Sequence, residues 1–415
     1  MKAMPRVPKW FLPVLIVASS ATQVAAQSMT RDSAVVRIVD NTRPSWPAGK
    51  GWTLSPEPTV DIGSGEDSLY ELATVMGAVR LSDGAIAIAN MGTTNIRVYD
   101  ARGRYLRAIG RRGQGPGEFR QVMGLVRRPG DTLAVIDSRE EIEFFSIDGK
   151  FARGLRSLSH KDGLVLSGFH FFDDGSFART SWPQSGNHRD GRWLDSLTVL
   201  AVTKADTQGR IISRHPAIEY IKTPALPFAQ TTTFAPGGFI VGDGDGYYVG
   251  YADRYEIRRH RLDGKLHLIV RAPWTPQLVR DRDKERYREF IINMGAEGGG
   301  PIDPRLLAQR KKMMEEVSFA RHLPAYSFML VDSDRNLWVS ESDLEWFLSQ
   351  GFSRVVSTPS SWRVFDRTGR WLGTVRMPAR FRPTDIGNDY VLGLWRDADD
   401  VEHVRMHRLT KPGPG

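Results

Sequence analysis

The stretch "IGRRGQGPGEFRQVMGLV" (residues 109–126) decides how the chain is interpreted, because a glycine-rich run can either hold a phosphate or connect repeated structural units. A phosphate loop runs from a strand into the N-terminus of a helix, and its nucleotide-binding form continues into Gly-Lys-Ser or Gly-Lys-Thr. Here apolar alternation lies on both sides of the glycines, and no such continuation follows. The pattern therefore predicts a connection between two strands.

The same stretch has a partner 47 residues earlier in the chain, "IGSGEDSLYELATVMGAV" (residues 62–79). Ile62 aligns with Ile109, and Val75–Gly77 aligns with Val122–Gly124. In both copies two segments of apolar alternation follow, each folded back at a turn, which is the pattern of two β-hairpins. One repeated unit therefore contains four strands.

Four weaker copies follow, and their second hairpins lie at residues 200–214, 257–271, 362–376 and 401–409. The sixth copy stops after its third strand, whereas "PTVDIG" (residues 58–63) is a strand without a unit of its own. Pairing the two would close a ring and remove exposed sheet edges.

With these repeats and the connection "GRRGQGPGEF" (residues 110–119), the chain resembles the six-bladed β-propellers of the NHL-repeat, TolB-like superfamily. The resemblance covers residues 52–411, and only the first two units carry the signature closely. It implies an all-β fold of six four-stranded blades, closed by the N-terminal strand. Residues 27–51 are then an N-terminal extension outside the propeller.

Residues 1–26 have the composition of a secretory signal peptide. The basic start "MKAMPRVPK" precedes the apolar "WFLPVLIVA", and Val24 and Ala26 provide the small residues that are read at a cleavage site. The apolar core is shorter than the ~20 residues needed to span a bilayer, and no later segment is apolar enough to do so. We expect an exported protein, periplasmic or extracellular, with no membrane span in the mature chain.

The composition of the 415 residues narrows the choice of chemistry and partner. There is no cysteine, so the chain has no disulfide, no thiol nucleophile and no thiolate metal site. Loss of Lys2, Arg6 and Lys9 with the signal peptide lowers the formal charge from +9 to +6, and 48 acidic residues are interleaved with the basic ones. This balance argues against nucleic acid as a partner.

Three insertions interrupt the regular blades, at residues 181–195, 274–322 and 343–359. In a propeller all three emerge from the same face, and long loops at one end of a rigid scaffold commonly carry function. The largest insertion predicts two amphipathic helices, with Thr275 and Asp303, each followed by proline, as N-caps. We expect these helices to fold back as a lid over part of the channel mouth.

The two smaller insertions contain four aromatic candidates for ligand binding, Trp182, Trp193, Trp346 and Phe347. Such side chains could stack on a sugar or hold a peptide. Alternatively, they could form a small core beneath their own loops. The residue pattern leaves both possibilities open.

Oxygen-bearing side chains dominate the position that ends the second strand of each blade, including Asn90, Asp137, Asp253 and Glu341. Propellers of the gluconolactonase class hold a divalent cation with Asn, Asp and Glu at the channel mouth, and this set is similar in residue type. The resemblance implies a calcium-like site. The same residue types also end strands simply because they cap turns.

Two functions are compatible with these observations. The favoured hypothesis is an exported, non-catalytic binding or scaffold propeller that holds a peptide, a glycan or a partner protein on its inserted face. The alternative is a metal-assisted hydrolase or lactonase that uses the oxygen ring. The Gly-x-Ser-x-Gly elbow of α/β-hydrolases does not occur, and the fold alone does not choose between the two functions.

Overall fold

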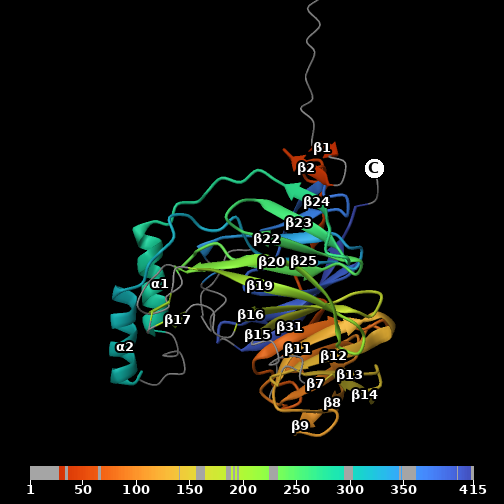
Figure 1. Cartoon of the computed structure of the whole chain (residues 1–415). Helices are drawn as coiled ribbons and strands as arrows, with labels where there is room; N and C mark the ends of the chain where they lie inside the picture. The colour runs from red at the N-terminus through yellow and green to blue at the C-terminus, as the bar shows by residue number, and fades with distance from the viewer. Residues whose placement is uncertain are drawn as a thin grey trace, which may run out of the picture.

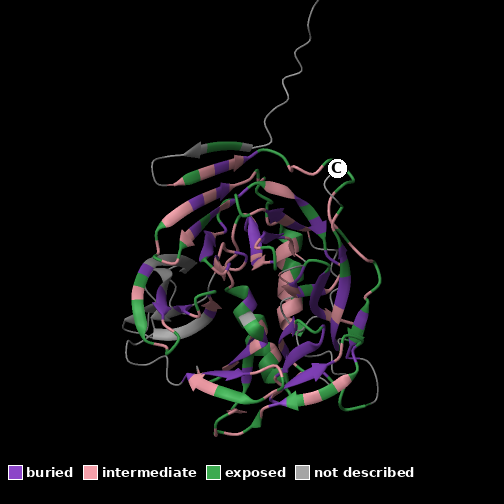
Figure 2. Ribbon diagram, turned by 90° about the vertical axis from the view of Figure 1, so that its right-hand side faces the viewer, coloured by how far each residue is buried: buried purple, intermediate pink, exposed green. Residues whose placement is uncertain are grey.

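The computed structural model describes residues 28–32, 36–63, 67–139, 141–155, 164–183, 188–189, 192–193, 196–223, 232–293, 302–344, 347, 361–399 and 401–412. The chain forms six antiparallel sheets, each with four blade strands, arranged as a ring (Figures 1 and 2). The six-bladed β-propeller predicted from the repeats is confirmed.

The strands follow chain order within each blade. Blades 1 to 3 are β5 (Val75–Arg80), β6 (Ile86–Asn90), β7 (Asn95–Tyr99), β8 (Tyr105–Ile109); β11 (Val122–Arg128), β12 (Thr132–Asp137), β13 (Glu141–Phe145), β14 (Phe151–Leu155); and β15 (Leu164–Phe171), β16 (Phe177–Pro183), β19 (Ser196–Ala205), β20 (Ile211–Thr223). Blades 4 to 6 are β21 (Gly238–Gly242), β22 (Gly246–Tyr251), β23 (Glu256–Arg261), β24 (Leu266–Arg271); β25 (Tyr326–Val331), β26 (Leu337–Glu341), β27 (Ser361–Phe365), β28 (Trp371–Arg376); and β29 (Phe381–Ile386), β30 (Tyr390–Arg396), β31 (Glu402–Thr410), completed from the N-terminal side. Two-residue strands pair in the connections: β9 (Arg111–Arg112) with β10 (Glu118–Phe119), and β17 (His188–Arg189) with β18 (Arg192–Trp193).

The hydrophobic core lies between neighbouring blades. All five residues of β6 are buried, because the sheet is covered on both faces. One cluster joins Ile96 and Val98 of blade 1 to Leu125 and Val135 of blade 2. Since no disulfide is available, this burial of apolar surface is the main stabilising contribution to the ring.

Glycine recurs at the outer hairpin turns for two reasons, which Gly103 and Gly149 illustrate. Their φ angles are 82° and 87°, a left-handed conformation that glycine adopts without steric penalty. A Cβ on Gly103 would lie 3.0 Å from Cγ1 of Val60, and a Cβ on Gly149 would lie 3.0 Å from Cγ1 of Ile109. Val60 and Ile109 belong to the outer strand of the preceding blade, so each turn also packs directly on its neighbour.

The ring closes through the N-terminal strand, as the incomplete sixth repeat predicted. Strand β4 (Val60–Ile62) pairs antiparallel with β31, and β3 (Thr53–Leu54) pairs with the end of the same strand. Blade 6 therefore takes its outer strand from the opposite end of the chain.

Two strands of the predicted N-terminal extension, residues 28–32 and 37–41, belong to the sheet of a blade. Strand β2 (Arg37–Asn41) pairs in parallel with β24, and β1 (Ser28–Asp32) pairs with β2, so the sheet of blade 4 has six strands (Figure 1). The backbone nitrogen of Trp46 then donates to the carbonyl oxygen of Leu372 in blade 5 at 2.7 Å. We call residues 37–54 the strap, because they run along the outer edges of blades 4, 5 and 6.

Asn41 fixes the strap at the boundary between two blades. Its Nδ2 donates to the carbonyl oxygens of Arg271 in blade 4 and Gly369 in blade 5, both at 3.0 Å. Its Oδ1 accepts from the backbone nitrogen of Trp371 at 2.8 Å. One buried side chain thus joins three backbone groups that lie far from it in sequence.

The helical insertion lies between β24 and β25, as predicted. Helix α1 spans Asp281–Asn293 and α2 spans Pro304–Glu315. Both helices lie on one side of the propeller in Figure 1. In Figure 2, which looks along the axis of the propeller, they overlap its centre. The predicted N-cap Asp303 accepts a hydrogen bond from the backbone nitrogen of Arg305 at 2.7 Å.

The other predicted N-cap, Thr275, does not start a helix, because α1 begins at Asp281. The backbone nitrogen of Val279 instead donates to the carbonyl oxygen of Arg321 at 3.0 Å, and that of Leu323 donates to the carbonyl oxygen of Gln277 at 2.9 Å. This pairing satisfies the backbone groups and overrides the local Thr-Pro signal. It also forms a firm base for the insertion.

The end of the ring away from the insertion is occupied by contacts between the turns of the inner hairpins. The backbone nitrogen of Ser82 in blade 1 donates to Oδ2 of Asp131 in blade 2 at 3.1 Å. At the junction of blades 6 and 1, the backbone nitrogen of Arg80 donates to Oδ2 of Asp385 at 2.8 Å. Polar groups at this end are therefore used to hold blades together.

No helix within the described ranges is long and apolar enough to cross a membrane. Residues 1–26, predicted to be a signal peptide, lie outside the described residues, so that assignment stays a prediction.

Candidate ligand-binding site

Two pockets lie side by side where the insertion joins blades 4 and 5. The aromatic pocket, of about 350 Å³, is lined by the segment Thr232–Phe239 with Tyr287, Pro324, Tyr326, Ser327 and Phe347. The Arg363 pocket, of about 450 Å³, is lined by Thr42–Pro44 of the strap, Pro273–Thr275, Gln277, Ala325, Glu341, Ser342, Arg363 and Trp371. Both volumes lie in the range of small-ligand sites.

A single segment, residues 324–327, separates the two pockets. Ala325 lines the Arg363 pocket, whereas Tyr326 and Ser327 line the aromatic pocket. The hydroxyl groups of Ser327 and Ser342, one from each lining, are hydrogen-bonded to each other. A ligand that filled both pockets would therefore extend across residues 324–327.

Aromatic rings from three separate parts of the chain meet at Phe234 in the aromatic pocket. Its ring centroid lies 5.2 Å from that of Tyr287 on α1 and 5.1 Å from that of Phe347, at interplanar angles of 75° and 62°. The ring of Phe319, which follows α2, lies 5.7 Å away. The pairs with Tyr287 and Phe347 are edge-to-face, which is a favourable arrangement for aromatic rings. Together the contacts join the insertion to the propeller.

Phe234 itself has a strained backbone. Its φ is 62°, and the residue is buried; a bulky residue in this region costs about 1–3 kcal/mol and needs surrounding structure to hold it there. The support comes from Thr233, whose nitrogen donates to the carbonyl oxygen of Ser318 at 2.8 Å and whose oxygen accepts from the nitrogen of Ala320 at 2.9 Å. Strain of this kind concentrates at functional sites.

Tyr287 adds a hydroxyl group to a wall that also contains Thr232, Thr233 and Ser327. Burial raises the pKa of its hydroxyl, and a hydrogen bond with Thr233 acts in the opposite direction. The hydroxyl therefore stays protonated at neutral pH and can donate a hydrogen bond.

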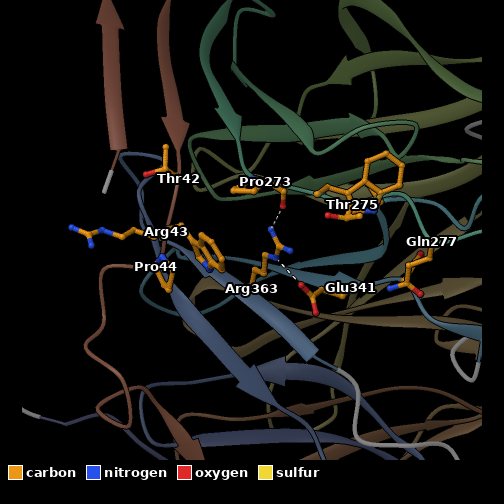
Figure 3. A pocket seen from close by; sticks show the side chains of 12 residues that line it. Thr42, Arg43, Pro44, Pro273, Thr275, Gln277, Glu341 and Arg363 are labelled. Carbon is orange, nitrogen blue, oxygen red and sulfur yellow. Dashed lines mark hydrogen bonds and ion pairs between the residues drawn. The ribbon is translucent and has the colours of Figure 1, made fainter. Parts of the chain in front are cut away.

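Arg363 on β27 organises the second pocket (Figure 3). Its Nε donates to Oε1 of Glu341 at 2.8 Å, and its Nη1 donates to the carbonyl oxygen of Pro273 at 2.7 Å. The guanidinium carbon lies 4.5 Å from the ring centroid of Tyr255 and 4.8 Å from that of Trp371, which are cation–π distances. Two hydrogen bonds and two aromatic rings thus hold the guanidinium group in place.

The four predicted aromatic candidates have different positions. Phe347 lines the aromatic pocket and packs on Phe234. Trp182 lies in β16 and Trp193 in β18, and nothing is described of their side chains. Trp346 lies outside the described residues. Only Phe347 is therefore placed at the candidate site.

The predicted oxygen ring does not form a ligand cluster within the described residues. No three His, Asp or Glu side chains there are arranged to hold a metal ion. Oδ1 of Asn90 accepts from the nitrogen of Ala73 at 3.0 Å, and Oδ2 of Asp137 accepts from the nitrogen of Arg120 at 2.7 Å. These oxygens cap the entry into the first strand of their own blade, which is the turn-capping role that the residue types also allowed.

The other two members of that ring lie apart from these caps. Asp253 is exposed in the connection between β22 and β23. Glu341 lines the Arg363 pocket through its ion pair with Arg363. The position at the end of the second strand therefore serves a different purpose in different blades.

Sequence reasoning missed four residues of the site. Phe234 has no local signal for its left-handed backbone, and Arg363 lies in an ordinary strand pattern. Trp274 could have been noted because it lies at the start of the insertion, and Trp371 because it begins a predicted strand. The pocket that they share could not be predicted, because residues of the strap form part of its lining.

The fold and the site together define a six-bladed β-propeller with a pocketed, helix-bearing face. In agreement, residues 71–157 match the family model DUF5128, described as a 6-bladed beta-propeller. No curated protein matches the sequence.

Solved structures resemble the fold at low sequence identity. A member of the DUF4221 family from Bacteroides vulgatus is 11% identical, with 87% of this chain and 98% of that chain covered and a TM-score of 0.52. A gluconolactonase from Xanthomonas campestris is 14% identical (88% and 99% covered, TM-score 0.42). A streptogramin B lyase is 12% identical (88% and 99% covered, TM-score 0.40). At these identities the likeness concerns the fold alone.

Proposed function

We propose that this chain is a non-catalytic ligand-binding propeller, which holds a peptide, a glycan or a partner protein on the face that carries the helical insertion. The observation that carries the proposal is the convergence of the strap, the insertion and blades 4 and 5 on two adjoining pockets. The ring is closed by other residues, in the pairs that β3 and β4 form with β31.

The linings favour binding over chemistry. Arg363 is paired with Glu341, and Ser327 is hydrogen-bonded to Ser342, so these four polar side chains are each engaged with a neighbour. The remaining walls consist mainly of aromatic rings, prolines and neutral polar groups. Such surfaces offer shape, stacking and hydrogen bonds.

The proposal includes export, on the strength of the sequence pattern of residues 1–26. A binding protein outside the cytoplasm meets peptides and glycans in solution. A fold without cysteine is then stabilised by its core and its ring closure alone.

The metal-assisted alternative depends on an oxygen ring whose members Asn90 and Asp137 already accept backbone hydrogen bonds. We therefore base the proposal on the pockets and test the metal separately.

A thermal-shift screen tests the proposed function. Purified protein would be heated with a panel of short aromatic and proline-containing peptides and neutral oligosaccharides. Each compound that raises the melting temperature would then be measured on Tyr287→Ala and Trp274→Ala. The matched control is Leu306→Ala, at an exposed position of α2.

We expect at least one compound to stabilise the native protein and the Leu306→Ala control, because ligands stabilise the state they bind. One of the two pocket variants should lose that stabilisation. Equal stabilisation of all variants, or no stabilising compound in the panel, would contradict binding at these pockets.

A further inference from the structure

We infer that the Arg363 pocket is a subsite for a neutral saccharide ring. This rests on the proposed binding function and narrows it to one class of ligand at one of the two pockets. The lining combines an ion pair, exposed hydrogen-bonding groups and two indoles.

The charged groups at the centre of the pocket balance each other, and the side chain of Arg43, the third charged residue of the lining, points away from them in Figure 3. Glu341 and Arg363 form an ion pair with a distance of 2.8 Å between Oε1 and Nε. The Glu341 side chain is 38% exposed, whereas that of Arg363 is 12% exposed. The carboxylate therefore faces the pocket, and its charge is balanced from behind by the guanidinium.

Among the described residues, only one oxygen of that carboxylate has a hydrogen-bond partner. Oε1 of Glu341 accepts from Arg363, and Oε2 makes no hydrogen bond with any residue in the described ranges. A carboxylate oxygen is a strong acceptor for a hydroxyl donor. Gln277 and Thr275, which lie on the Glu341 side of the pocket in Figure 3, add groups that both donate and accept.

Two tryptophans supply the apolar part of the lining. Trp274 comes from the connection after β24, and Trp371 comes from the start of β28. The indole of Trp371 is fixed, because its Nε1 donates to the carbonyl oxygen of Gly373 at 3.0 Å and its face lies against Arg363. Held in this way, it offers a rigid apolar surface.

A saccharide ring matches this combination. Its carbon–hydrogen faces pack against aromatic rings, and its hydroxyl groups donate to carboxylates and accept from amides and hydroxyls. A purely apolar ligand would cover Oε2 of Glu341 and the amide of Gln277 without offering either a hydrogen bond, which is unfavourable. An anionic ligand would face the exposed carboxylate. The aromatic pocket, by contrast, has no charged residue in its lining.

The strap is required for this subsite. Thr42, Arg43 and Pro44 form the side of the pocket opposite Thr275 and Gln277 (Figure 3). Because Asn41 fixes these residues to blades 4 and 5, the wall is already positioned before a ligand arrives.

The test is ligand-observed NMR and calorimetry of the full mature chain with five neutral disaccharides: maltose, cellobiose, lactose, xylobiose and N,N′-diacetylchitobiose. Glucuronic acid and N-acetyl-phenylalanine amide serve as anionic and apolar comparison probes. The variants are Trp274→Ala, Trp274→Phe and Glu341→Gln. The matched control is Glu256→Gln, which alters another glutamate held by an arginine, with 2.9 Å between Oε2 of Glu256 and Nε of Arg271.

We expect at least one disaccharide to bind and glucuronic acid to bind more weakly. Trp274→Ala and Glu341→Gln should each weaken binding by about tenfold or more, which corresponds to the loss of one stacking or charge-assisted contact. Trp274→Phe should retain part of the affinity, and Glu256→Gln should match the native protein. Circular dichroism of each variant shows that the fold is intact.

The outcomes separate the two proposals. If no disaccharide binds while the apolar probe binds and is lost in Tyr287→Ala, the saccharide subsite is excluded and the binding function stands. If a disaccharide binds equally well to Trp274→Ala and Glu341→Gln, the subsite is placed wrongly. If no probe of any kind binds, both proposals fail.

Discussion

Nε of Arg405 on β31 lies 2.8 Å from Oδ2 of Asp61 on β4, although 344 positions separate the two residues in the sequence. The other oxygen of the same carboxylate lies 2.7 Å from Nδ1 of His403. Through His403 and Arg405, Asp61 therefore joins the closing strand β4 to β31.

The pH dependence of this closure follows from the state of Asp61. Burial raises the pKa of the carboxyl, but hydrogen bonds from His403 and Arg405 and their charges outweigh it, so the pKa lies below its ordinary value. The stabilisation is therefore present above the unfolded pKa of about 3.9 and is lost as the pH falls through the lower, folded value.

We expect Asp61→Asn to lower the free energy of unfolding at neutral pH by about 1–3 kcal/mol, because it removes hydrogen bonds to a charged group. The variant should also lose less stability than the native protein on acidification below pH 4. Urea unfolding at pH 7 and pH 3.5 measures both effects. Asp100→Asn, which alters a surface ion pair with Arg104, is the control, and equal behaviour of the two variants would argue against a special role for Asp61.

Gly373→Ala should detach the strap from blade 5. A Cβ at this position would lie 1.9 Å from Cε3 of Trp46, so the indole must move. Overpacking of this kind typically costs about 1–3 kcal/mol. The measurements are urea unfolding and the rate of proteolysis within the strap.

Gly77→Ala is the matched control, because a Cβ there meets its nearest atom, the carbonyl oxygen of Leu125, at 3.6 Å, an ordinary contact. If the two alanine variants were equally stable and equally resistant to protease, Trp46 would not anchor the strap.

Replacing residues 281–316 with a short Gly-Ser linker should leave the ring folded. This variant retains the backbone pairing of Val279 with Arg321 and of Thr233 with Ser318 at the base of the insertion. No residue of α1 is buried, and Met314 is the one buried residue of α2, so the helices add little to the core. The removal of Tyr287 should change binding at the aromatic pocket.

Circular dichroism and thermal unfolding would measure the fold of that variant, and the peptide probe its binding. Loss of cooperative unfolding would mean that the helices belong to the core, and the interpretation of α1 and α2 as a separable lid would be wrong.

Acidification should also weaken the contact between blades 3 and 4 at His215. Nδ1 of His215 lies 2.7 Å from the hydroxyl oxygen of Tyr247, and the ring of His260 stacks on Tyr247 with centroids 5.3 Å apart. Burial lowers the pKa of both histidines; at His215, Lys204 and His260 act in the same direction and Asp263 opposes them.

Since the folded pKa lies below the unfolded value of about 6.5, the unfolded state takes up protons first as the pH falls. Stability should therefore decrease from about pH 6.5 downward. Melting temperatures between pH 8 and pH 5 would show a shallower decrease for His215→Gln than for the native protein. An identical pH dependence would exclude His215 as a contributor.

The calcium hypothesis has its own test. Asp137 accepts from two backbone nitrogens at 2.7 Å, those of Arg120 and Arg139. We therefore expect Asp137→Ala to lower the melting temperature equally with calcium and with chelator, and elemental analysis to show no stoichiometric calcium. A stoichiometric ion that Asp137→Ala releases would restore the metal site and, with it, the hydrolase alternative.

The fold could be predicted because its determinants are local and repeated. Gly103 and Gly149 recur where each outer hairpin packs on the preceding blade, and the missing strand of blade 6 pointed to residues 58–63. Asp303 was identified as an N-cap by its own short sequence. These signals need no knowledge of distant residues.

The strap and most of the site could not be predicted in this way. The pairing of β2 with β24 depends on an edge that exists only after blade 4 has formed. Thr275 carried a helix signal, yet pairing with residues 321–323 prevails. The left-handed backbone of Phe234 is imposed by contacts with three distant segments, and Phe347 was found only because it lies in a long loop.

The strap and the closing strand also set the order in which the molecule can be completed. Asn41 makes hydrogen bonds with residues that follow it by 230, 328 and 330 positions in the sequence. The partner of Asp61, Arg405, follows it by 344 positions. During synthesis β2 cannot join its sheet before β24 has emerged, and β4 cannot join its sheet before β31 has emerged. Contacts of such long sequence separation slow folding. Before these pairings form, the outer edges of blades 4 and 6 lack their N-terminal strands and are open to pairing with other molecules.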